Sequence, residues 1–310
     1  MSENAFLAFS LPSPITEIKS ELLEAKRVQL YIKREDQIHP WLSGNKYRKL
    51  KYNILNAASE GKSTFITFGG AFSNHLYAMA GAGKLFGLKT IGIVRGEVDE
   101  NNPTLRFCKK MGMSLFPVSR QEYRLKESSD EIKKIISQYP ESCIIPEGGT
   151  NELALKGVSE MLDEMYQQMT YVPDFITLSC GTGGTTAGIL SHFQLESRVL
   201  AFSSLKSDHH YNEILTLAGN KNNALLSVQT DYHFDGYGCW DDTLLDFIAE
   251  FENNHQIPLD HVYNGKAMYG LFDMIKKDQF SPGTSICFIH TGGLQGKYGL
   301  EYIQGKRSIK

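Results

Sequence analysis

Short apolar segments rich in β-branched and aromatic residues alternate along the chain with longer segments of helical periodicity. The apolar segments, bounded by turn-forming residues, predict strands at residues 28–32, 64–68, 89–94, 114–117, 143–145, 175–179, 198–202 and 285–289. The periodic segments predict helices at residues 46–60, 74–86, 103–110, 120–138, 151–168, 185–192, 241–253, 267–276 and 295–302. Residues 203–237 are polar and irregular and support no assignment.

This alternation predicts the α/β fold class. Strands separated by helices of such length need crossover connections, which favour a mostly parallel, doubly wound sheet. In sheets of this kind ligands bind beyond the carboxyl ends of the strands. The segments that follow the predicted strands are therefore expected to carry the functional residues. The pattern alone indicates no domain boundary.

Composition narrows the range of partners. The 310 residues are 41% apolar and 22% charged, and the net charge is −3. This charge gives no reason to expect nucleic acid or an anionic membrane surface as a partner. No long apolar stretch is present, and residues 1–5 lack the basic and apolar regions of a signal peptide. A cytoplasmic location is the expectation.

The cysteines do not suggest a metal site. Five are present, widely spaced and without a C-x-x-C pair, so neither zinc ligation nor a disulfide framework is expected. Cys143, Cys180 and Cys287 lie in apolar runs and are expected to be buried, unreactive thiols.

Lys46 stands in an unusual basic context. The segment K-R-E-D at 33–36 is followed by S-G-N-K-Y-R-K at 43–49, so that Arg48 and Lys49 lie close to Lys46. Positive neighbours and burial both lower the pKa of a lysine and leave a nucleophilic amine. The local sequence alone is also consistent with Lys46 being an ordinary solvated lysine at the start of a helix. The choice depends on residues far along the chain.

A glycine-rich turn follows the strand predicted at 175–179. It reads C-G-T-G-G-T-T and precedes a predicted helix. Glycines allow close approach of the backbone, and threonine hydroxyls add donors, so the turn predicts a phosphate pocket. The Lys-Ser/Thr ending of a P-loop is absent, and a plain tight turn is the alternative.

Three further segments join a strand or loop to a helix. Ser73 and Asn74 follow the predicted strand at 64–68 and are either helix caps or polar groups presented to a ligand. The segments V-Y-N-G-K at 262–266 and H-T-G-G at 290–293 have the same form. P-E-G-G-T-N at 146–151 is explained nearly as well by a turn that starts a helix.

Together these motifs resemble the fold-type II family of pyridoxal-phosphate enzymes. They are most similar to the branch of 1-aminocyclopropane-1-carboxylate deaminases and D-cysteine desulfhydrases, with the motifs in family order from 33–36 to 290–293. The resemblance implies two doubly wound domains with the cofactor between them. Residues 1–49 and 151–310 would form a large domain and residues 50–150 a smaller one. It also implies a homodimer and a small amino acid substrate.

The resemblance assigns roles position by position. Lys46 would hold pyridoxal 5'-phosphate as a Schiff base, and Asn74 would bond the ring hydroxyl oxygen. The cofactor phosphate would be held by Gly181, Thr182, Gly183, Gly184 and Thr185.

The remaining assignments concern the substrate and the cofactor ring. Ser73, Tyr263 and Tyr237 match catalytic positions, and Ser73 and Asn74 would also contact the substrate, with His75 and Phe72 beside them. Asn264 and Thr291 match positions near the ring nitrogen.

Several of these positions depart from the deaminase pattern. The deaminases carry Glu and Leu where this chain has Asn264 and Thr291. A glutamate would keep the ring nitrogen protonated, and neutral Asn264 should do so less, which argues against cyclopropane opening. Phe72 replaces a family glutamine and is expected to narrow and dry one side of the pocket. Leu76-Tyr77 stands where the family has an arginine.

The resulting hypothesis is α,β-elimination of the D-cysteine desulfhydrase type, giving pyruvate, hydrogen sulfide and ammonia. The alternatives are a 1-aminocyclopropane-1-carboxylate deaminase and a weakly catalytic cofactor-binding protein in which Phe72 blocks the substrate site. A third alternative, outside the family, is a nucleotide-binding protein that uses residues 181–188.

Overall fold

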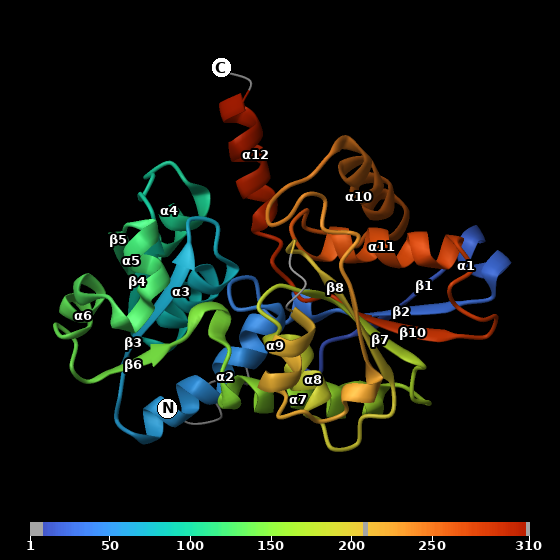
Figure 1. The fold of residues 1–310 in the computed structure, drawn as a ribbon, viewed down its shortest axis with the longest axis horizontal. Coiled ribbons are helices and arrows are strands. Elements are labelled where there is room, and N and C mark those ends of the chain that lie inside the picture. The colour runs from blue at the N-terminus through green and yellow to red at the C-terminus, as the bar shows by residue number, and fades with distance from the viewer. Residues whose placement is uncertain (1–8, 207–209, 308–310) are drawn as a thin grey trace.

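The protein contains two β-sheets (Figure 1). A computed structural model gives the structure, and it describes residues 9–206 and 210–307. The larger sheet has the strand order β1 (Ile15–Ile18), β2 (Gln29–Lys33), β10 (Ser285–Ile289), β7 (Phe175–Cys180), β8 (Arg198–Ser203), β9 (Leu226–Gln229). The smaller sheet has the order β5 (Ser114–Val118), β4 (Lys89–Arg95), β3 (Thr64–Gly70), β6 (Ser142–Ile145).

Neighbouring strands run parallel in both sheets, except that β1 pairs antiparallel with β2 at an edge. The predicted α/β class with mostly parallel sheets is therefore confirmed. All strands of the smaller sheet come from the predicted smaller domain at 50–150. The domain limits themselves stay a prediction.

Helices surround both sheets (Figure 1). Their bounds are α1 (Glu21–Lys26), α2 (Gly44–Ser59), α3 (Asn74–Phe86), α4 (Pro103–Lys110), α5 (Arg120–Leu125), α6 (Asp130–Ile136), α7 (Glu152–Gln168), α8 (Gly184–Leu190), α9 (His210–Leu217), α10 (Asp242–His255), α11 (Asn264–Lys276) and α12 (Gly296–Arg307). Within the described ranges, none of these helices combines the length and apolarity needed to cross a membrane.

Alternation along the strands explains why helices pack on both faces of each sheet. Successive side chains of a strand point to opposite faces. On β10, Ile286 and Phe288 pack in one core with residues of α10 and α11, whereas Cys287 and Ile289 pack in another with residues of α7 and α8. The smaller sheet is covered in the same way, by α2, α3 and α4 on one face and by α5 and α6 on the other.

The eight predicted strands are all present, with ends that differ by two residues or fewer. The single helix predicted at 120–138 is wrong, because a short 3-10 turn separates α5 from α6. Lys126 has a positive φ of 50°, and the side chain of Ser129 accepts a hydrogen bond from the Ile132 N–H and so starts a new helix. The unassigned stretch at 203–237 contains α9 and β9, and the short elements β1 and α1 were also not predicted.

A buried ion cluster connects α2 to the larger sheet and to α7. The guanidinium of Arg48 donates to both oxygens of Glu35 at 2.8 Å and to both oxygens of Glu164 at 2.6 and 2.7 Å. Arg48 and Glu35 are almost completely buried. Lys33, also buried, donates to the backbone oxygen of Ser13 at 2.7 Å and lies 3.6 Å from Glu164. The K-R-E-D segment and the helix that carries Lys46 are thus parts of one network.

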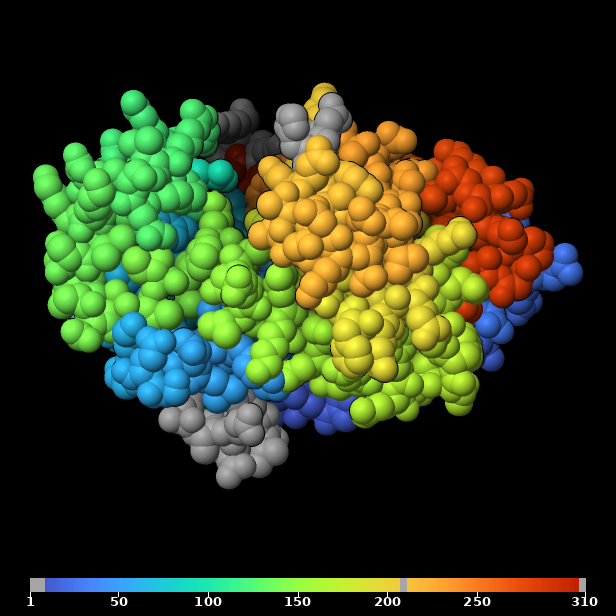
Figure 2. All heavy atoms as spheres, turned by 60° about the horizontal axis from the view of Figure 1, so that its bottom comes forward, coloured from blue at the N-terminus to red at the C-terminus, as the bar shows by residue number. Residues whose placement is uncertain are grey.

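The backbones of α2 and α7 also approach closely. A Cβ atom on Gly157 of α7 would lie 2.0 Å from the carbonyl oxygen of Arg48, so only glycine fits at this point. The face in Figure 2 shows α2, in blue, meeting the yellow-green residues of α7. Helix α2 lies between the two sheets, and this contact fixes its position relative to the larger one (Figure 1).

We expect Arg48→Met to lower the free energy of unfolding by about 3–5 kcal/mol, because it leaves the buried Glu35 carboxylate without its ion-pair partner and leaves Glu164 with Lys33 alone. Urea unfolding followed by circular dichroism measures this. Arg106→Met, at an exposed position of α4, is the control and should change stability by less than about 0.5 kcal/mol. Equal effects of the two substitutions would contradict a stabilising role for the cluster.

Candidate active site

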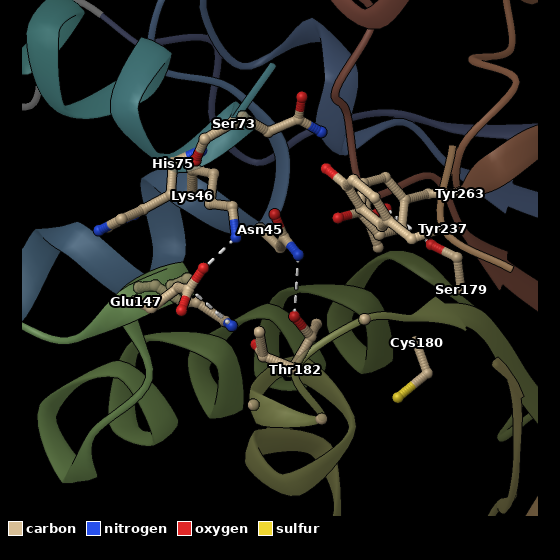
Figure 3. A pocket seen from close by; sticks show the side chains of 18 of the residues that line it. Asn45, Lys46, Ser73, His75, Glu147, Ser179, Cys180, Thr182, Tyr237 and Tyr263 are labelled. Atoms are coloured by element: carbon tan, nitrogen blue, oxygen red, sulfur yellow. Dashed lines mark hydrogen bonds between the residues drawn. The ribbon is translucent and has the colours of Figure 1, made fainter. Parts of the chain in front are cut away.

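A cavity of about 440 Å³ lies beyond the carboxyl ends of β3, β6, β7 and β10 (Figure 3). Each strand is followed by one of the segments identified in the sequence. Helix α2 adds the side chains of Asn45, Lys46 and Lys49 to the wall. Residues from both sheets therefore meet in one place, as the parallel topology requires.

Lys46 lies in the first turn of α2 and points into the cavity (Figure 3). Its amine donates to the Gly148 carbonyl oxygen at 3.2 Å. Burial lowers the pKa of Lys46 to about 8, because the charged form loses its hydration. The sequence argument also invoked Arg48, but that guanidinium is held in the ion cluster. Burial, and not positive neighbours, accounts for the shift at Lys46.

Lys49 is a second buried amine that the sequence argument treated only as a neighbour of Lys46. It donates to the Gly148 oxygen at 3.3 Å and to Thr150 Oγ1 at 3.1 Å. Burial, and secondarily the charge of Lys46, hold the pKa of Lys49 well below its usual value. It forms no ion pair with a carboxylate of the described residues. Its spacing of three residues from Lys46 could have revealed it, since such residues share a helix face.

The glycine-rich loop faces Lys49. A Cβ atom on Gly184 would lie 2.8 Å from the amine of Lys49 and would also collide with the Thr150 hydroxyl. Gly183 adopts a φ of +75°, which favours glycine. Asn45 donates to Thr185 Oγ1 at 2.9 Å and so connects the loop to α2. The loop and an uncompensated amine thus form a cradle suited to a phosphate dianion.

Ser73 both caps α3 and lines the cavity. Its oxygen accepts from the N–H groups of His75 and Leu76, each at 3.2 Å, which leaves the hydroxyl proton available. Beside it, the Oδ1 of Asn74 accepts from the Gln295 amide. The Nδ2 of Asn74 is then the end that can donate to a ring oxygen. Ser73 and Asn74 thus lie both at the start of α3 and at the cavity, so the two interpretations of this pair are compatible.

His75 and Phe72 also line the cavity. Thr67 donates its hydroxyl proton to the Ile145 oxygen, so it accepts from Nε2 of His75 at 2.7 Å. Burial and the nearby lysines hold the pKa of His75 well below its usual value, so the ring is neutral. Phe72 packs partly against α12, where its ring lies 6.4 Å from that of Tyr302.

Tyr263 and Tyr237 face Lys46 from the opposite wall (Figure 3). Their rings meet edge to face at 5.9 Å, and the Tyr263 ring lies against Gly181. Burial, reinforced by Tyr237, raises the pKa of Tyr263 well above its usual value. The amine of Lys266 donates to the carbonyl oxygens of His233 and Gly236, both at 2.7 Å, and so holds the loop that presents Tyr237.

Asn264 lies behind the cavity wall and supports Thr291. Its Nδ2 donates to Asp260 at 2.8 Å and to the Gly292 oxygen at 2.7 Å, and its Oδ1 accepts from the N–H and hydroxyl of Thr291 at 3.0 Å. Every polar atom of this amide is therefore occupied. Thr291 has one hydroxyl proton, so Ser179, at 3.1 Å, donates to Thr291. The sequence assigned Asn264 directly to the cofactor, but among these residues only Thr291 and Ser179 line the cavity.

The site fits pyridoxal phosphate. Lys46 is a buried amine for the cofactor aldehyde, the 181–185 loop and Lys49 suit its phosphate, and Asn74 offers a donor for its ring oxygen. A fold with these features defines a pyridoxal-phosphate enzyme. In agreement, residues 11–292 match the family described as "Pyridoxal-phosphate dependent enzyme". The chain belongs to this family, and pyridoxal phosphate is its cofactor.

Individual relatives carry more specific names. The chain is 32% identical to the mitochondrial bifunctional D-cysteine desulfhydrase/1-aminocyclopropane-1-carboxylate deaminase of Arabidopsis thaliana, over 96% of this chain and 80% of that protein. It is 29% identical to the D-cysteine desulfhydrase of Salmonella typhi, over 91% and 92% of the two chains. A crystal structure of an ACC deaminase homologue superposes with a TM-score of 0.80 at 27% identity, over 94% and 93%.

We expect the apo-protein to capture pyridoxal phosphate at a rate that rises with pH through about 8 and levels off above it. Only the neutral amine is nucleophilic, and burial lowers the pKa of Lys46 to about 8. Stopped-flow absorbance near ~420 nm measures this, and Lys46→Ala should give no band. A rate that keeps rising to about pH 10.5, as for a solvated lysine, would contradict the assignment.

Lys266→Met should loosen the loop at 233–238, because two hydrogen bonds to its carbonyl oxygens are lost. Amide exchange there should accelerate by at least about tenfold, as expected for losing about 1 kcal/mol for each bond. The KM for an amino acid should rise with cofactor content retained. Lys276→Met, on the exposed side of the same helix, is the control. Unchanged exchange in Lys266→Met would show that the loop is held by other contacts.

Proposed function

We propose that the protein is a pyridoxal-phosphate lyase that performs α,β-elimination on a small amino acid, with D-cysteine converted to pyruvate, hydrogen sulfide and ammonia. The names of its relatives support this range of chemistry, since they include D-cysteine desulfhydrase and 1-aminocyclopropane-1-carboxylate deaminase. We also propose that the protein is a cytoplasmic homodimer, as the sequence and the resemblance suggest. In each subunit, residues 1–49 and 151–310 would form the large domain and residues 50–150 the small domain.

The observation that carries the choice of elimination is the neutral wall at Thr291. Ser179, Thr291 and Asn264 form a chain of neutral hydrogen-bonding groups there. Among the described residues that line the cavity, Glu147 is the single carboxylate, and it lies on the far side from Ser179 (Figure 3). A ring nitrogen placed against neutral hydroxyls is protonated less readily than one placed against a carboxylate. The resulting weaker electron sink suits elimination of a good leaving group.

The chain's own residues would divide the work as follows. The bound cofactor supplies the electron sink that makes the α-hydrogen acidic. The amine of Lys46, released when substrate binds, takes the α-proton, and its low pKa keeps it a competent base near neutral pH. The hydroxyl proton of Ser73 and the N-terminus of α3 would bind the substrate carboxylate at the end of the cavity next to α3. Tyr263, held neutral by its raised pKa, offers a proton to the departing group.

Cyclopropane ring opening is the second candidate, because the same relatives include deaminases. It must break a carbon–carbon bond and so depends more on a strong electron sink. The neutral wall at Thr291 therefore supports it less well than it supports elimination.

The test compares two products from the holoenzyme. We expect sulfide and pyruvate from D-cysteine with a kcat/KM at least about tenfold above that for 2-oxobutanoate formation from 1-aminocyclopropane-1-carboxylate. Ser73→Ala should lower kcat/KM for D-cysteine by about tenfold or more with the cofactor band retained. Lys84→Ala, exposed on α3, is the control.

Two outcomes would overturn the proposal. Faster formation of 2-oxobutanoate would favour the deaminase. A loaded protein without turnover across D- and L-amino acids would favour a weakly catalytic cofactor-binding protein.

A further inference from the structure

Arg95 places a cation on the wall of the site that the proposed reaction does not use. It is the last residue of β4, and its register partner is Gly70, the last residue of β3. The segment after Gly70 carries Phe72 and Ser73, so Arg95 lies on the small-sheet side of the cavity that it helps to line. Its guanidinium is 3.4 Å from where a Cβ on Gly70 would lie, which is ordinary van der Waals contact, so the guanidinium lies directly beside the end of β3.

The charge of Arg95 has no partner within the described residues. Glu147, the lining carboxylate, is paired with Lys126 at 2.6 Å. Arg95 itself forms no ion pair there and packs over the Tyr123 ring at 5.7 Å. Lys126 contacts the same ring at 3.3 Å. The Lys126–Glu147 pair therefore adds no net charge, and the guanidinium of Arg95, which is exposed to solvent, has no counter-charge among the described residues.

The charges in the cavity indicate which kind of group Arg95 can bind. Lys49 faces the phosphate cradle, and Lys46 is used for cofactor attachment. The carboxylate of an amino acid is matched at Ser73 and the N-terminus of α3. A substrate with a neutral side chain, such as D-cysteine, leaves Arg95 without an anion. A guanidinium stays protonated in proteins and suits bidentate recognition of carboxylates and phosphates.

We infer that Arg95 is a specificity-determining residue that selects amino acids with an anionic group on the side chain. This inference rests on the proposed α,β-elimination and places anionic amino acids ahead of neutral D-cysteine among its substrates. For an anionic β-substituent such as the phosphate of O-phosphoserine, the α-proton passes to Lys46 and the Cβ–O bond breaks. Phosphate leaves with the bonding pair. The enamine product then takes up one water to give pyruvate and ammonium.

The first experiment measures binding without turnover. Aspartate and asparagine differ by one charge, have nearly the same shape and lack a ready leaving group. In the holoenzyme, D- or L-aspartate should perturb the cofactor absorbance at a concentration about tenfold lower than the matching asparagine, as expected for a charge-assisted contact at an exposed site. This ratio should shrink as salt is raised from about 0.05 to 0.5 M, because exposed charges are screened.

Variants connect the ratio to Arg95. Arg95→Gln should bring the aspartate-to-asparagine ratio close to one, and Arg95→Lys should keep part of it. Arg106→Gln, which removes an exposed arginine of α4 outside the cavity, should leave the ratio unchanged. Equal responses to aspartate and asparagine in the parent protein, no response to either, or a ratio that survives in Arg95→Gln would each overturn the inference. The salt dependence keeps the test valid if Arg95→Gln folds poorly.

A turnover experiment separates this inference from the proposed function. O-phosphoserine should give pyruvate with a kcat/KM about tenfold above that of O-acetylserine, and Arg95→Gln should remove the difference. Aspartate selection without pyruvate from any substrate would sink the proposed elimination and leave the role of Arg95 intact. Sulfide release from D-cysteine without a preference for aspartate over asparagine would support the proposed elimination and contradict the role of Arg95.

Discussion

The position of the reactive amine depends on the buried ion cluster around Arg48. One guanidinium bonds both oxygens of Glu35 from the segment after β2 and both oxygens of Glu164 from α7. The first turns of α2 thereby carry the Lys46 amine toward the cavity on one side and the Arg48 anchor on the other. A buried ion cluster contributes little net stability over an apolar core, but losing one partner costs several kcal/mol. In this protein the ion cluster fixes the position of α2.

That placement also determines the chemistry of Lys46. Between the two sheets, its amine has the Gly148 carbonyl as its hydrogen-bond partner and no carboxylate among the described residues. Burial then lowers its pKa, and the same burial leaves Lys49 without a counter-charge opposite the glycine-rich loop. Loss of hydration prepares the nucleophile at Lys46, and at Lys49 it leaves an amine whose charged form a bound anion would stabilise.

The two ends of the cavity differ in charge. Near Thr291 the polar groups that line the cavity are neutral, and each donor and acceptor of Asn264 behind them is already used. Near Arg95 a fixed charge is uncompensated. The first property concerns how strongly the cofactor ring can accept electrons, and the second concerns which side chain a substrate brings. We therefore propose that reaction type and substrate choice are set by different walls of one site.

Local sequence determined most of the fold and the composition of the site. Short apolar segments rich in β-branched and aromatic residues located all eight strands predicted, and turn-forming glycines marked the loops that follow β3, β7 and β10. The limits of local reasoning are visible at 120–138, where a positive φ at Lys126 divides one periodic segment into two helices.

Only the tertiary structure decided which residues act together. It turned Arg48 away from Lys46, placed Asn264 behind Thr291, brought Lys49 and Arg95 to the cavity wall, and set Lys266 against the loop that carries Tyr237. Burial and partner choice decided these roles. Both depend on elements far apart in the chain, so the residue types were present in the sequence but their pKa values, hydrogen bonds and free charges were set by packing.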